Sequence, residues 1–399
     1  MTPSDVAALP LRGVRVLDLS RIYSGPYCTF LLAMAGAEVI KVETPDGEHL
    51  RKRNANTGAA LPFPMLNANK RFMTLDIKTP RGRDIVRALV PRMDVLVENF
   101  RPDVMDQFGL GRKTLTEINP RLIYASINGF GREGPYRNDA AMDLTIQARS
   151  GIMDSTGFQD NPPVKAGPAI CDFYAGVHLY GAIVSALLHR ERTGEALAPE
   201  VAMLDAIYPS LCSNLAMAMA DDNYVRRTGN RHGGLSQCPY NVYPAADGYF
   251  AIICINDRHW RGLLRALGRE DLDQPRFATI SDRVRHMDYI DAELAKATAS
   301  KTRGDLAVAL NAAGVPCGPV HSLTEVIHDP HLHANGMLCE IDHPEFGPLT
   351  LSHSPLRFLD HPRTPYQPSQ VLGAETASVL AEIGIGAADL AALRNDRVI

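Results

Sequence analysis

The sequence predicts an α/β protein built around a mostly parallel sheet. Short runs rich in Val, Ile and Leu alternate with segments of helical period, and this alternation recurs along the first part of the chain. Strands that alternate with helices favour a sheet covered on both faces. The length of 399 residues favours two domains over one core.

The N-terminal segment has the pattern of a βαβ unit. Residues 13–20 form a predicted strand, residues 28–36 a short helix and residues 37–43 a second strand. Two strands joined by a helix within about 30 residues are typical of this unit. The same alternation predicts helices at 81–89 and 115–118 and strands at 94–98 and 122–127.

A long helix is predicted after Asp172, with apolar residues at helical spacing as far as Leu188 and an end at Gly194. A strand at 199–203 and a helix at 204–220 follow. From Asp221 the pattern of residues along the chain changes, and this change predicts a smaller second domain over residues 221–323. Its expected elements are a polar loop at 226–234, a strand at 249–254 and helices at 260–267, 289–297 and 304–313. From Met337 the chain is strand-like again, with turn residues at Gly347 and Pro348.

Composition excludes several classes of protein. A formal net charge of -4 offers no basic field for nucleic acid. Seven cysteines without a CxxC pair argue against a disulfide framework or zinc site and fit a reducing cytoplasm. We expect no signal peptide and no apolar run long enough to span a membrane.

The common cofactor and hydrolase motifs do not identify an activity. Tyr23-Ser24-Gly25-Pro26 follows the first strand in place of GxGxxG, and no GxxxxGK[ST], HExxH or GxSxG is found. His331 and His333 lack a third ligand at a suitable spacing, so we predict no metal. These patterns alone indicate an α/β enzyme and leave its reaction open.

An ordered set of less common motifs resembles the class III coenzyme A transferase family, which includes formyl-CoA transferases, carnitine CoA-transferases and α-methylacyl-CoA racemases. The motifs run in family order from about residue 11 to residue 358. They are LDLSRIYSGP at 17–26, GAEVIKVE at 36–43, NANKR at 67–71, LDIKTP at 75–80, VENFRP at 97–102, NPRLIY at 119–124, SINGFG at 126–131, GPAICD at 167–172, GNRH at 229–232 and GVPCGP at 314–319.

This resemblance implies a Rossmann-like large domain built from both chain ends, residues 1–220 and 324–399, with the smaller α+β domain inserted between them. It also implies a homodimer in which two subunits interlock as rings. The implied substrates are an acyl-CoA thioester and a free carboxylic acid, with no tightly bound cofactor.

The resemblance assigns Asp172 as the nucleophile. A carboxylate can attack the donor thioester to give a mixed anhydride, and the released thiolate can then form an aspartyl-CoA thioester that passes CoA to the acceptor acid. From local sequence alone, an Asp before an apolar helical period is equally well a helix N-cap. Both roles favour the ionised carboxylate.

Further residues match CoA-contacting positions of the family. These residues are Tyr23, Ser24, Asp76, Lys78, Thr79, Asn99, Phe100, Arg101 and Met203. Without the resemblance, Lys78 and Arg101 are ordinary surface charges and Met203 is an ordinary core residue.

Two departures from formyl-CoA:oxalate members bear on the substrate. Tyr23 stands where they carry Gln, and Gln107 where they carry Arg. Their glycine-rich lid is absent as such, with 229–237 the nearest equivalent. Polar Arg21, Tyr23 and His232 instead favour succinyl-CoA as donor and a small dicarboxylate as acceptor.

Two other functions stay open. One is an α-methylacyl-CoA racemase, whose relatives carry His before Asp at the position of Met142 and Asp143; a thioether cannot act as an acid or base. The other is a noncatalytic acyl-CoA-binding protein, against which Asp172 argues.

Overall fold

The computed structural model describes residues 9–53, 58, 60–359 and 361–399. The chain divides into two compact units. The first contains Met1–Ile146, Pro168–Pro209 and Asp329–Ile399, and the second contains Gln147–Gly167 and Ser210–His328. The domain limits 1–220, 221–323 and 324–399 remain a prediction.

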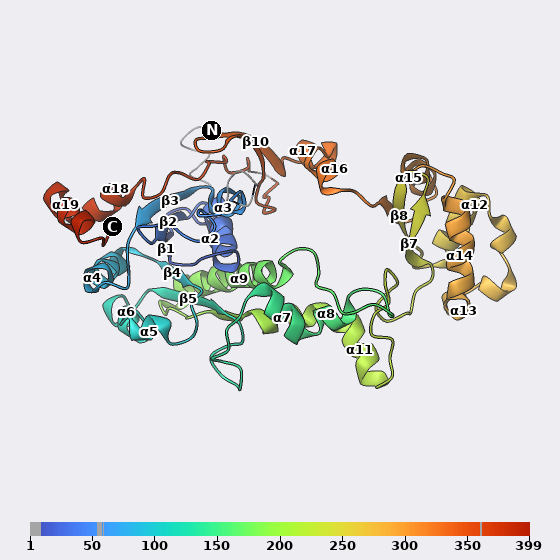
Figure 1. The fold of residues 1–399 in the computed structure, drawn as a ribbon, viewed down its shortest axis with the longest axis horizontal. Helices are drawn as coiled ribbons and strands as arrows, with labels where there is room; N and C mark the ends of the chain where they lie inside the picture. The colour runs from blue at the N-terminus through green and yellow to red at the C-terminus, as the bar shows by residue number, and fades with distance from the viewer. Residues whose placement is uncertain (1–8, 54–57, 59, 360) are drawn as a thin grey trace. The chain divides into compact units, whose positions relative to one another are not determined.

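A six-stranded parallel sheet lies at the centre of the first unit (Figure 1). Its strands are β1 (Arg15–Asp18), β2 (Glu38–Glu43), β3 (Lys70–Thr74), β4 (Val95–Glu98), β5 (Ile123–Asn128) and β6 (Glu200–Ala202). Every neighbouring pair is parallel, in the order β3-β2-β1-β4-β5-β6. The predicted α/β class is therefore confirmed. The order reverses between β1 and β4, where open parallel sheets bind ligands beyond the carboxyl ends of their strands.

Helices cover both faces of this sheet. Residues of α4, α5, α6, α18 and α19 form one core cluster with alternate residues of the strands, including Leu17, Ile40 and Leu96. Helices α2 and α9 pack on β1, β5 and each other from the opposite face. The helices of this unit are α2 (Ser24–Met34), α3 (Pro62–Asn67), α4 (Pro80–Leu89), α5 (Val104–Gln107), α6 (Arg112–Ile118), α9 (Ile170–Thr193), α10 (Met203–Ile207), α17 (Pro330–Ala334), α18 (Thr376–Ala381) and α19 (Ala387–Asn395), with a 3-10 turn at Val90–Arg92.

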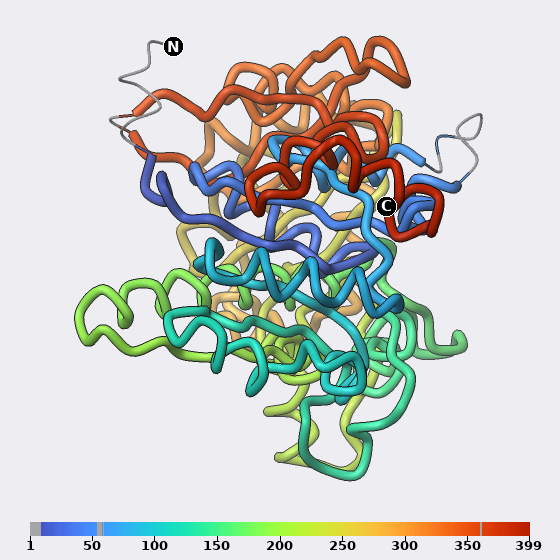
Figure 2. Tube along the Cα trace, turned by 90° about the vertical axis from the view of Figure 1, so that its left-hand side faces the viewer, coloured from blue at the N-terminus to red at the C-terminus, as the bar shows by residue number. Residues whose placement is uncertain are grey.

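The C-terminal segment packs against the N-terminal strands, as Figure 2 shows for the red and blue parts of the chain. The hairpin β10 (Leu338–His343) and β11 (Gly347–Ser352) precedes it. Glu382 of the segment following α18 accepts from Arg15 on β1 and from Arg71 on β3 at 2.5 and 2.8 Å. Both arginines also pair with Glu38 at the start of β2. This ion-pair group ties the chain end to the amino ends of three strands.

The second unit has its own sheet and core. Strands β7 (Tyr240–Ala245), β8 (Gly248–Ile253) and β9 (Cys317–Pro319) form an antiparallel sheet. Trp260, Phe250 and Phe277 are fully buried in its core cluster. Its helices are α8 (Ile152–Ser155), α11 (Cys212–Ala220), α12 (Asp257–Leu267), α13 (Ile280–Arg285), α14 (Met287–Thr298), α15 (Arg303–Ala312) and α16 (Leu323–Ile327), with 3-10 turns at Glu270–Leu272 and Pro275–Phe277. Two further elements, α7 (Asp143–Ser150) and the 3-10 turn Tyr208–Leu211, contain residues of both units.

Several predicted elements differ from the observed ones. Helix α2 begins at Ser24, four residues before the predicted start, so the Gly25-Pro26 pair lies inside its first turn. The helix predicted over 204–220 breaks into α10, a 3-10 turn and α11, because Pro209 has no N–H for a helical hydrogen bond. Strand β3 was not predicted, and Gly347 and Pro348 begin β11.

Helix α9 corrects one expectation about membranes. Its 24 residues include an 18-residue window of mean hydropathy 1.4, so length and composition would allow it to cross a membrane. The expectation that no apolar run is long enough is therefore wrong. About 44% of that window is buried inside the protein, and the helix packs on α2 and β5. A buried core helix gives the same signal, so this is weak evidence for a membrane.

Close packing of α2 on α9 depends on Gly176. A Cβ atom at this position would lie 2.6 Å from the backbone oxygen of Ser24 and 3.3 Å from the Tyr27 ring. Gly181, one and a half turns further along α9, would meet no atom within 4 Å. Because Gly176 has no side chain, the second turn of α9 can approach the first turn of α2 closely.

We expect Gly176→Ala to lower the free energy of unfolding by roughly 1–3 kcal/mol, because overpacking forces the helices apart. Gly181→Ala is the matched control and should be neutral or stabilising by up to about 1 kcal/mol, since Ala favours a helix over Gly. Differential scanning calorimetry of both variants gives the comparison. Equal midpoints for the two would show that α2 does not depend on this contact.

Candidate active site

The loops after β1 and β4 enclose a cavity of about 230 Å³ at the switch point of the sheet. The loop after β1 contributes Arg21, Ile22 and Ser24, and the loop after β4 contributes residues 99–102. The end of β5 and the segment before α7 complete the wall. The remaining lining residues are Ile127, Asn128, Gly129, Arg137, Asp139, Ala141, Met142, Asp172 and Met203.

Asp172 is the buried carboxylate of this cavity. It is the third residue of α9 and only 8% exposed. The backbone N–H and the hydroxyl of Ser24, the first residue of α2, lie beside this carboxylate and favour its charged form. Asp172 therefore lies near the amino-terminal ends of two helices, where negative charge is favoured.

The pKa of Asp172 is nevertheless raised, from 3.8 to about 7. Burial is the largest cause, because a carboxylate loses hydration inside the protein, and the nearby charge of Asp143 adds to it. The hydrogen bonds from Ser24 act in the opposite direction. Asp172 is thus poorly solvated yet substantially ionised near neutral pH, which makes it a strong candidate for a nucleophile or a base.

Asp143 caps the helix that carries Asp172. Its Oδ1 atom accepts from the N–H groups of Cys171 and Asp172 at 2.8 and 3.2 Å. The N-cap residue itself is Ala169, which has no side-chain acceptor. The alternative that Asp172 is an N-cap is therefore wrong. A carboxylate 29 residues earlier in the chain takes that role and leaves the side chain of Asp172 free to face the cavity.

Six of the residues predicted from the family resemblance line the cavity: Asp172, Ser24, Asn99, Phe100, Arg101 and Met203. Arg21 lies over the Phe100 ring, with its guanidinium carbon 4.9 Å from the ring centre. The Phe100 ring therefore already has a cationic partner from the neighbouring loop.

The other four predicted residues lie outside the cavity lining. Tyr23 precedes α2, stacks near Phe173 at 6.2 Å between ring centres, and accepts from Arg53 at 3.0 Å. Thr79 is the N-cap of α4 and accepts from the Gly82 N–H. Asp76 accepts from the N–H of Lys78 in the turn after β3. The carboxyl end of β3 is two strands from β1, so these residues follow the same edge of the sheet.

Sequence reasoning gave no site role to Asp143, Arg137 or Ile22. Arg137 lines the cavity and pairs at 2.6 Å with Asp103, the residue before α5. Ile22 has a φ of 65°, a conformation rare for a β-branched residue. No local signal marks these residues, because their partners lie in distant segments of the chain.

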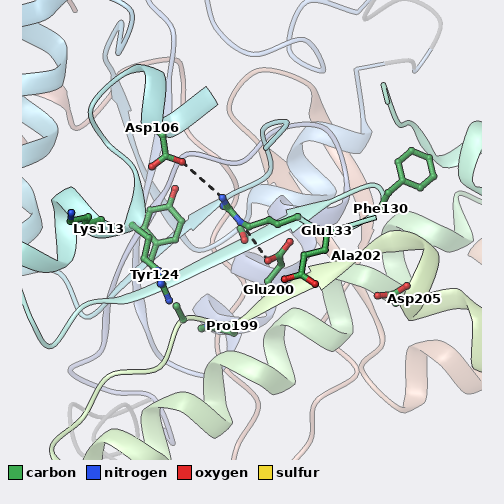
Figure 3. Close-up of a pocket in the computed structure, with 14 residues that line it drawn as sticks. Asp106, Lys113, Tyr124, Phe130, Glu133, Pro199, Glu200, Ala202 and Asp205 are labelled. Atoms are coloured by element: carbon green, nitrogen blue, oxygen red, sulfur yellow. Dashed lines mark ion pairs between the residues drawn. The ribbon is translucent and has the colours of Figure 1, made fainter. Parts of the chain in front are cut away.

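A larger cavity of about 700 Å³ lies beside β5 and β6 (Figure 3). Arg132 stands within 4 Å of the carboxylates of Glu98, Asp106 and Glu200 there. None of the ten residues assigned to catalysis or CoA contact from the family resemblance lines it. Arg132 already lies between three carboxylates, so the size of this cavity alone does not make it the reactive site.

Among the residues that the structure describes, no group of three His, Cys, Asp or Glu side chains is placed to hold a metal ion. His331 and His333 both lie on the short helix α17, where His331 faces the Asn335 amide at 2.8 Å.

A family model, curated relatives and solved structures all place this chain in the same family. Residues 11–376 match the model of CoA-transferase family III. The chain is 37% identical to a formyl-CoA:oxalate CoA-transferase of Streptomyces avermitilis over 98% of this chain and 99% of the relative. It is 35% identical to a succinate–glutarate CoA-transferase of Agrobacterium fabrum, covering 94% and 96% of the two chains. A CAIB/BAIF family protein from Brucella suis has a solved structure that matches with a TM-score of 0.82 and 37% identity, covering 94% of this chain and 99% of that one.

The raised pKa of Asp172 predicts a pH-dependent cost in stability. The folded protein holds this proton more tightly than the unfolded chain, so the ionised group destabilises the fold above about pH 7 and the loss is recovered as pH falls toward 4. Asp172→Asn should therefore be more stable than the native protein at about pH 8, by on the order of a few kcal/mol. The difference should shrink at about pH 5.

Thermal unfolding of both proteins across this pH range measures the effect. Asn is the suitable replacement because its amide oxygen can still accept from Ser24. A constant difference in stability from pH 5 to pH 8 would show that Asp172 titrates normally.

Proposed function

Because the chain belongs to CoA-transferase family III and is a CoA-transferase, we propose that the carboxylate of Asp172 is its nucleophile. The ionised oxygen attacks the thioester carbonyl of the donor acyl-CoA, forming the C–O bond of a mixed anhydride and expelling the CoA thiolate. The observation that carries this assignment is the position of Asp172: buried, partly ionised near neutral pH, and open to the cavity at the sheet's switch point.

The thiolate then attacks the aspartyl carbonyl, which forms an aspartyl-CoA thioester and releases the donor acid. The acceptor carboxylate attacks that thioester, forming a second mixed anhydride and expelling the CoA thiolate. The thiolate finally attacks the acceptor's carbonyl, which forms the new acyl-CoA and releases the carboxylate of Asp172. Each step exchanges one acyl bond for another, so no oxidant, metal or proton transfer from carbon is needed. Exclusion of water protects the anhydride and the thioester, and the burial of Asp172 supports this requirement.

Coenzyme A is assigned to the carboxyl edge of the sheet. We propose contacts from Ser24, Asn99, Phe100, Arg101 and Met203 near the thioester end, since these residues line the cavity with Asp172. Tyr23, Asp76, Lys78 and Thr79 lie on loops further along the same edge and are assigned to the remainder of CoA. Exposed Lys78 suits a phosphate group.

For the substrate class we propose succinyl-CoA as donor and a small dicarboxylate as acceptor. Relatives named succinate–glutarate and succinyl-CoA:mesaconate CoA-transferases, the latter from Haloarcula hispanica at 36% identity, cover nearly the whole chain. The cavity also holds Arg21 and Arg137, whose guanidinium groups suit the second carboxylate of such acids. Formyl-CoA:oxalate relatives make oxalate the acid to compare.

A racemase is not favoured by the site. Met142 lines the cavity where racemase-like relatives are expected to supply histidine, and its thioether cannot exchange a proton with carbon.

We also propose a homodimer. Helix α9 leaves Tyr174, Val177 and Leu188 between 43% and 51% exposed, on the side away from the residues it buries. Covering these apolar side chains by a second subunit would remove them from water. We further propose a cytoplasmic location, which the seven free cysteines support.

Asp172→Asn should lose transfer of CoA by at least about 10³-fold while keeping its fold, because the amide cannot form the anhydride. The assay follows CoA from succinyl-CoA onto succinate-size diacids and oxalate by mass spectrometry. Thr193→Ala, at the far end of the same helix, serves as a control and should keep full activity. Near-normal turnover by an Asp172→Asn protein shown to be free of deamidation would contradict the assignment.

The dimer proposal predicts that dilution to nanomolar concentration yields no folded monomer, because interlocked subunits separate only by unfolding. Analytical ultracentrifugation with fluorescence detection measures this. A folded monomer would show that the ring topology of the family does not apply to this chain.

A further inference from the structure

The turn that leads from β1 to Ser24 has an unusual backbone. Ile22 adopts a φ of 65°, which costs a β-branched residue free energy because its side chain crowds its own backbone. Such a conformation persists only where surrounding contacts enforce it. Ile22 lines the cavity, two residues before the hydrogen-bond donor of Asp172.

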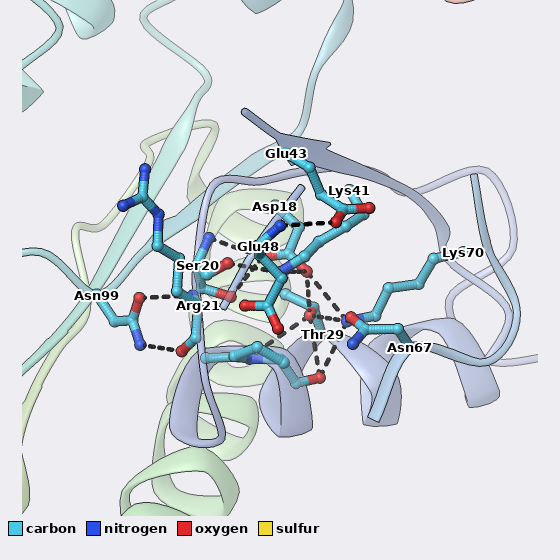
Figure 4. A network of polar contacts seen from close by, with 12 residues as sticks. Asp18, Ser20, Arg21, Thr29, Lys41, Glu43, Glu48, Asn67, Lys70 and Asn99 are labelled. Atoms are coloured by element: carbon cyan, nitrogen blue, oxygen red, sulfur yellow. Dashed lines mark hydrogen bonds and ion pairs between the residues drawn. The ribbon is translucent and has the colours of Figure 1, made fainter. Parts of the chain in front are cut away.

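Side chains from elsewhere in the chain hold this turn by its backbone (Figure 4). The first residue held is Ser20. Its N–H donates to Asp18 Oδ1 at 2.9 Å, and its carbonyl oxygen accepts from Lys41 Nζ at 2.5 Å. Lys41 and Asp18 are fully buried and stand in register on β2 and β1.

The next two residues are held in the same way. Asn99 accepts from the Arg21 N–H and donates to the Arg21 carbonyl, both at 2.8 Å. Glu48, which is 5% exposed, accepts from the Ile22 N–H at 3.1 Å. Three consecutive residues are thus fixed by side chains that lie between 2 and 78 positions away in the sequence.

The same contacts direct the Ser24 hydroxyl. Asn99 Nδ2 also donates to Ser24 Oγ at 3.3 Å. With that oxygen accepting from Asn99, the hydroxyl proton of Ser24 is left to turn toward Asp172, which lines the same cavity and whose charged form Ser24 favours.

The base of this assembly is a buried charge cluster. Asp18 accepts from Lys70 at 3.0 Å and from Thr29 at 2.6 Å, while Lys41 lies 3.9 Å away. Burial opposes ionisation of Asp18, but the two lysines and two hydroxyls outweigh it and hold its pKa at about 2. Asp18 therefore remains charged throughout the pH range in which Asp172 titrates.

We propose that Asp18, Lys41, Glu48 and Asn99 form a positioning clamp that holds residues 20–22 in a strained turn and thereby aims both donors of Ser24 at Asp172. Asp18, Lys41 and Glu48 lie outside the cavity lining, whereas Asn99 also lines the cavity, where we assign it to CoA. All four act through Ser24, whose hydrogen bonds favour the ionised nucleophile. This role rests on the proposed function of Asp172.

The clamp has a measurable consequence in the pH profile. Around Asp172 the cavity presents Arg21, Arg101, Arg137 and Asp139, and α7 presents Asp143. A variant that loosens the turn removes none of these five charged groups; Arg21 lies in the turn and moves with it, while the other four stay in place and the support from Ser24 weakens. The carboxylate then loses stabilisation, and the midpoint at which activity appears moves to higher pH.

The test uses Lys41→Met and Asn99→Ala in the full-length enzyme, with the pH dependence of kcat/KM for succinyl-CoA as readout. Each variant should raise the midpoint by roughly one pH unit and lower kcat by roughly tenfold or more. KM for the acyl-CoA should change less than kcat in Lys41→Met, whose side chain is buried behind the turn. If Lys41→Met does not fold, the pH midpoint of Asn99→Ala decides the test; its KM is not used, because Asn99 is also a proposed CoA contact.

Glu382→Gln is the matched control. It disturbs the ion-pair group at the amino ends of the same strands β1 to β3, away from the turn. It should lower the unfolding temperature without moving the midpoint. If the pH midpoint of kcat/KM is unchanged in Lys41→Met and Asn99→Ala while Asp172→Asn is inactive, the clamp proposal is wrong and the nucleophile proposal stands. Full activity of Asp172→Asn would overturn both.

Discussion

The close approach of Ser24 to Asp172 is the constraint on which the proposed chemistry depends. A carboxylate that attacks a thioester has to be ionised, yet it has to be shielded from the water that would hydrolyse its anhydride. In the mechanism that we propose for Asp172, the fold meets both demands by bringing the first turn of α2 against the first two turns of α9. Donors from Ser24 and two helix amino ends replace part of the lost hydration. Gly176 allows this approach, because any side chain there would meet the Ser24 carbonyl.

The site is held at some expense of stability. Asp172 is buried with a pKa of about 7, Asp143 places a second carboxylate nearby, and Ile22 is strained. Each of these features would be relieved in a protein selected for stability alone. The buried cluster around Asp18 lies directly below them, fully satisfied by lysines and hydroxyls. Because the cluster around Asp18 is fully hydrogen-bonded, it can hold the turn at residues 20–22 in its strained conformation.

Much of the framework could be predicted from the sequence. The first two strands, the helix after Asp172 and its end at Gly194 follow from apolar periodicity and from glycine at a helix end. The proposal of Asp172 as nucleophile comes from the resemblance alone. The surroundings of Asp172 could not be predicted. Asp143 accepts hydrogen bonds from a helix that begins 27 residues later, and Asn99 hydrogen-bonds to the backbone of Arg21, 78 residues earlier. Lysine in a strand pattern gives no sign that it will be buried, because only the fold supplies Asp18 beside Lys41. Strand β3 escaped prediction because its polar ends, Lys70 and Thr74, mask a short apolar centre.

The central claim is that Asp172 exchanges its own carboxylate oxygens during transfer. In the anhydride sequence, a bridging oxygen of Asp172 leaves with the donor acid, and one oxygen of the acceptor acid returns to the aspartate. Turnover with an acceptor dicarboxylate labelled with oxygen-18 should therefore place the label in the peptide that contains Asp172, and fragmentation should locate it on that side chain. An enzyme that has turned over many times with the labelled acid and carries no oxygen-18 at Asp172 would contradict the account.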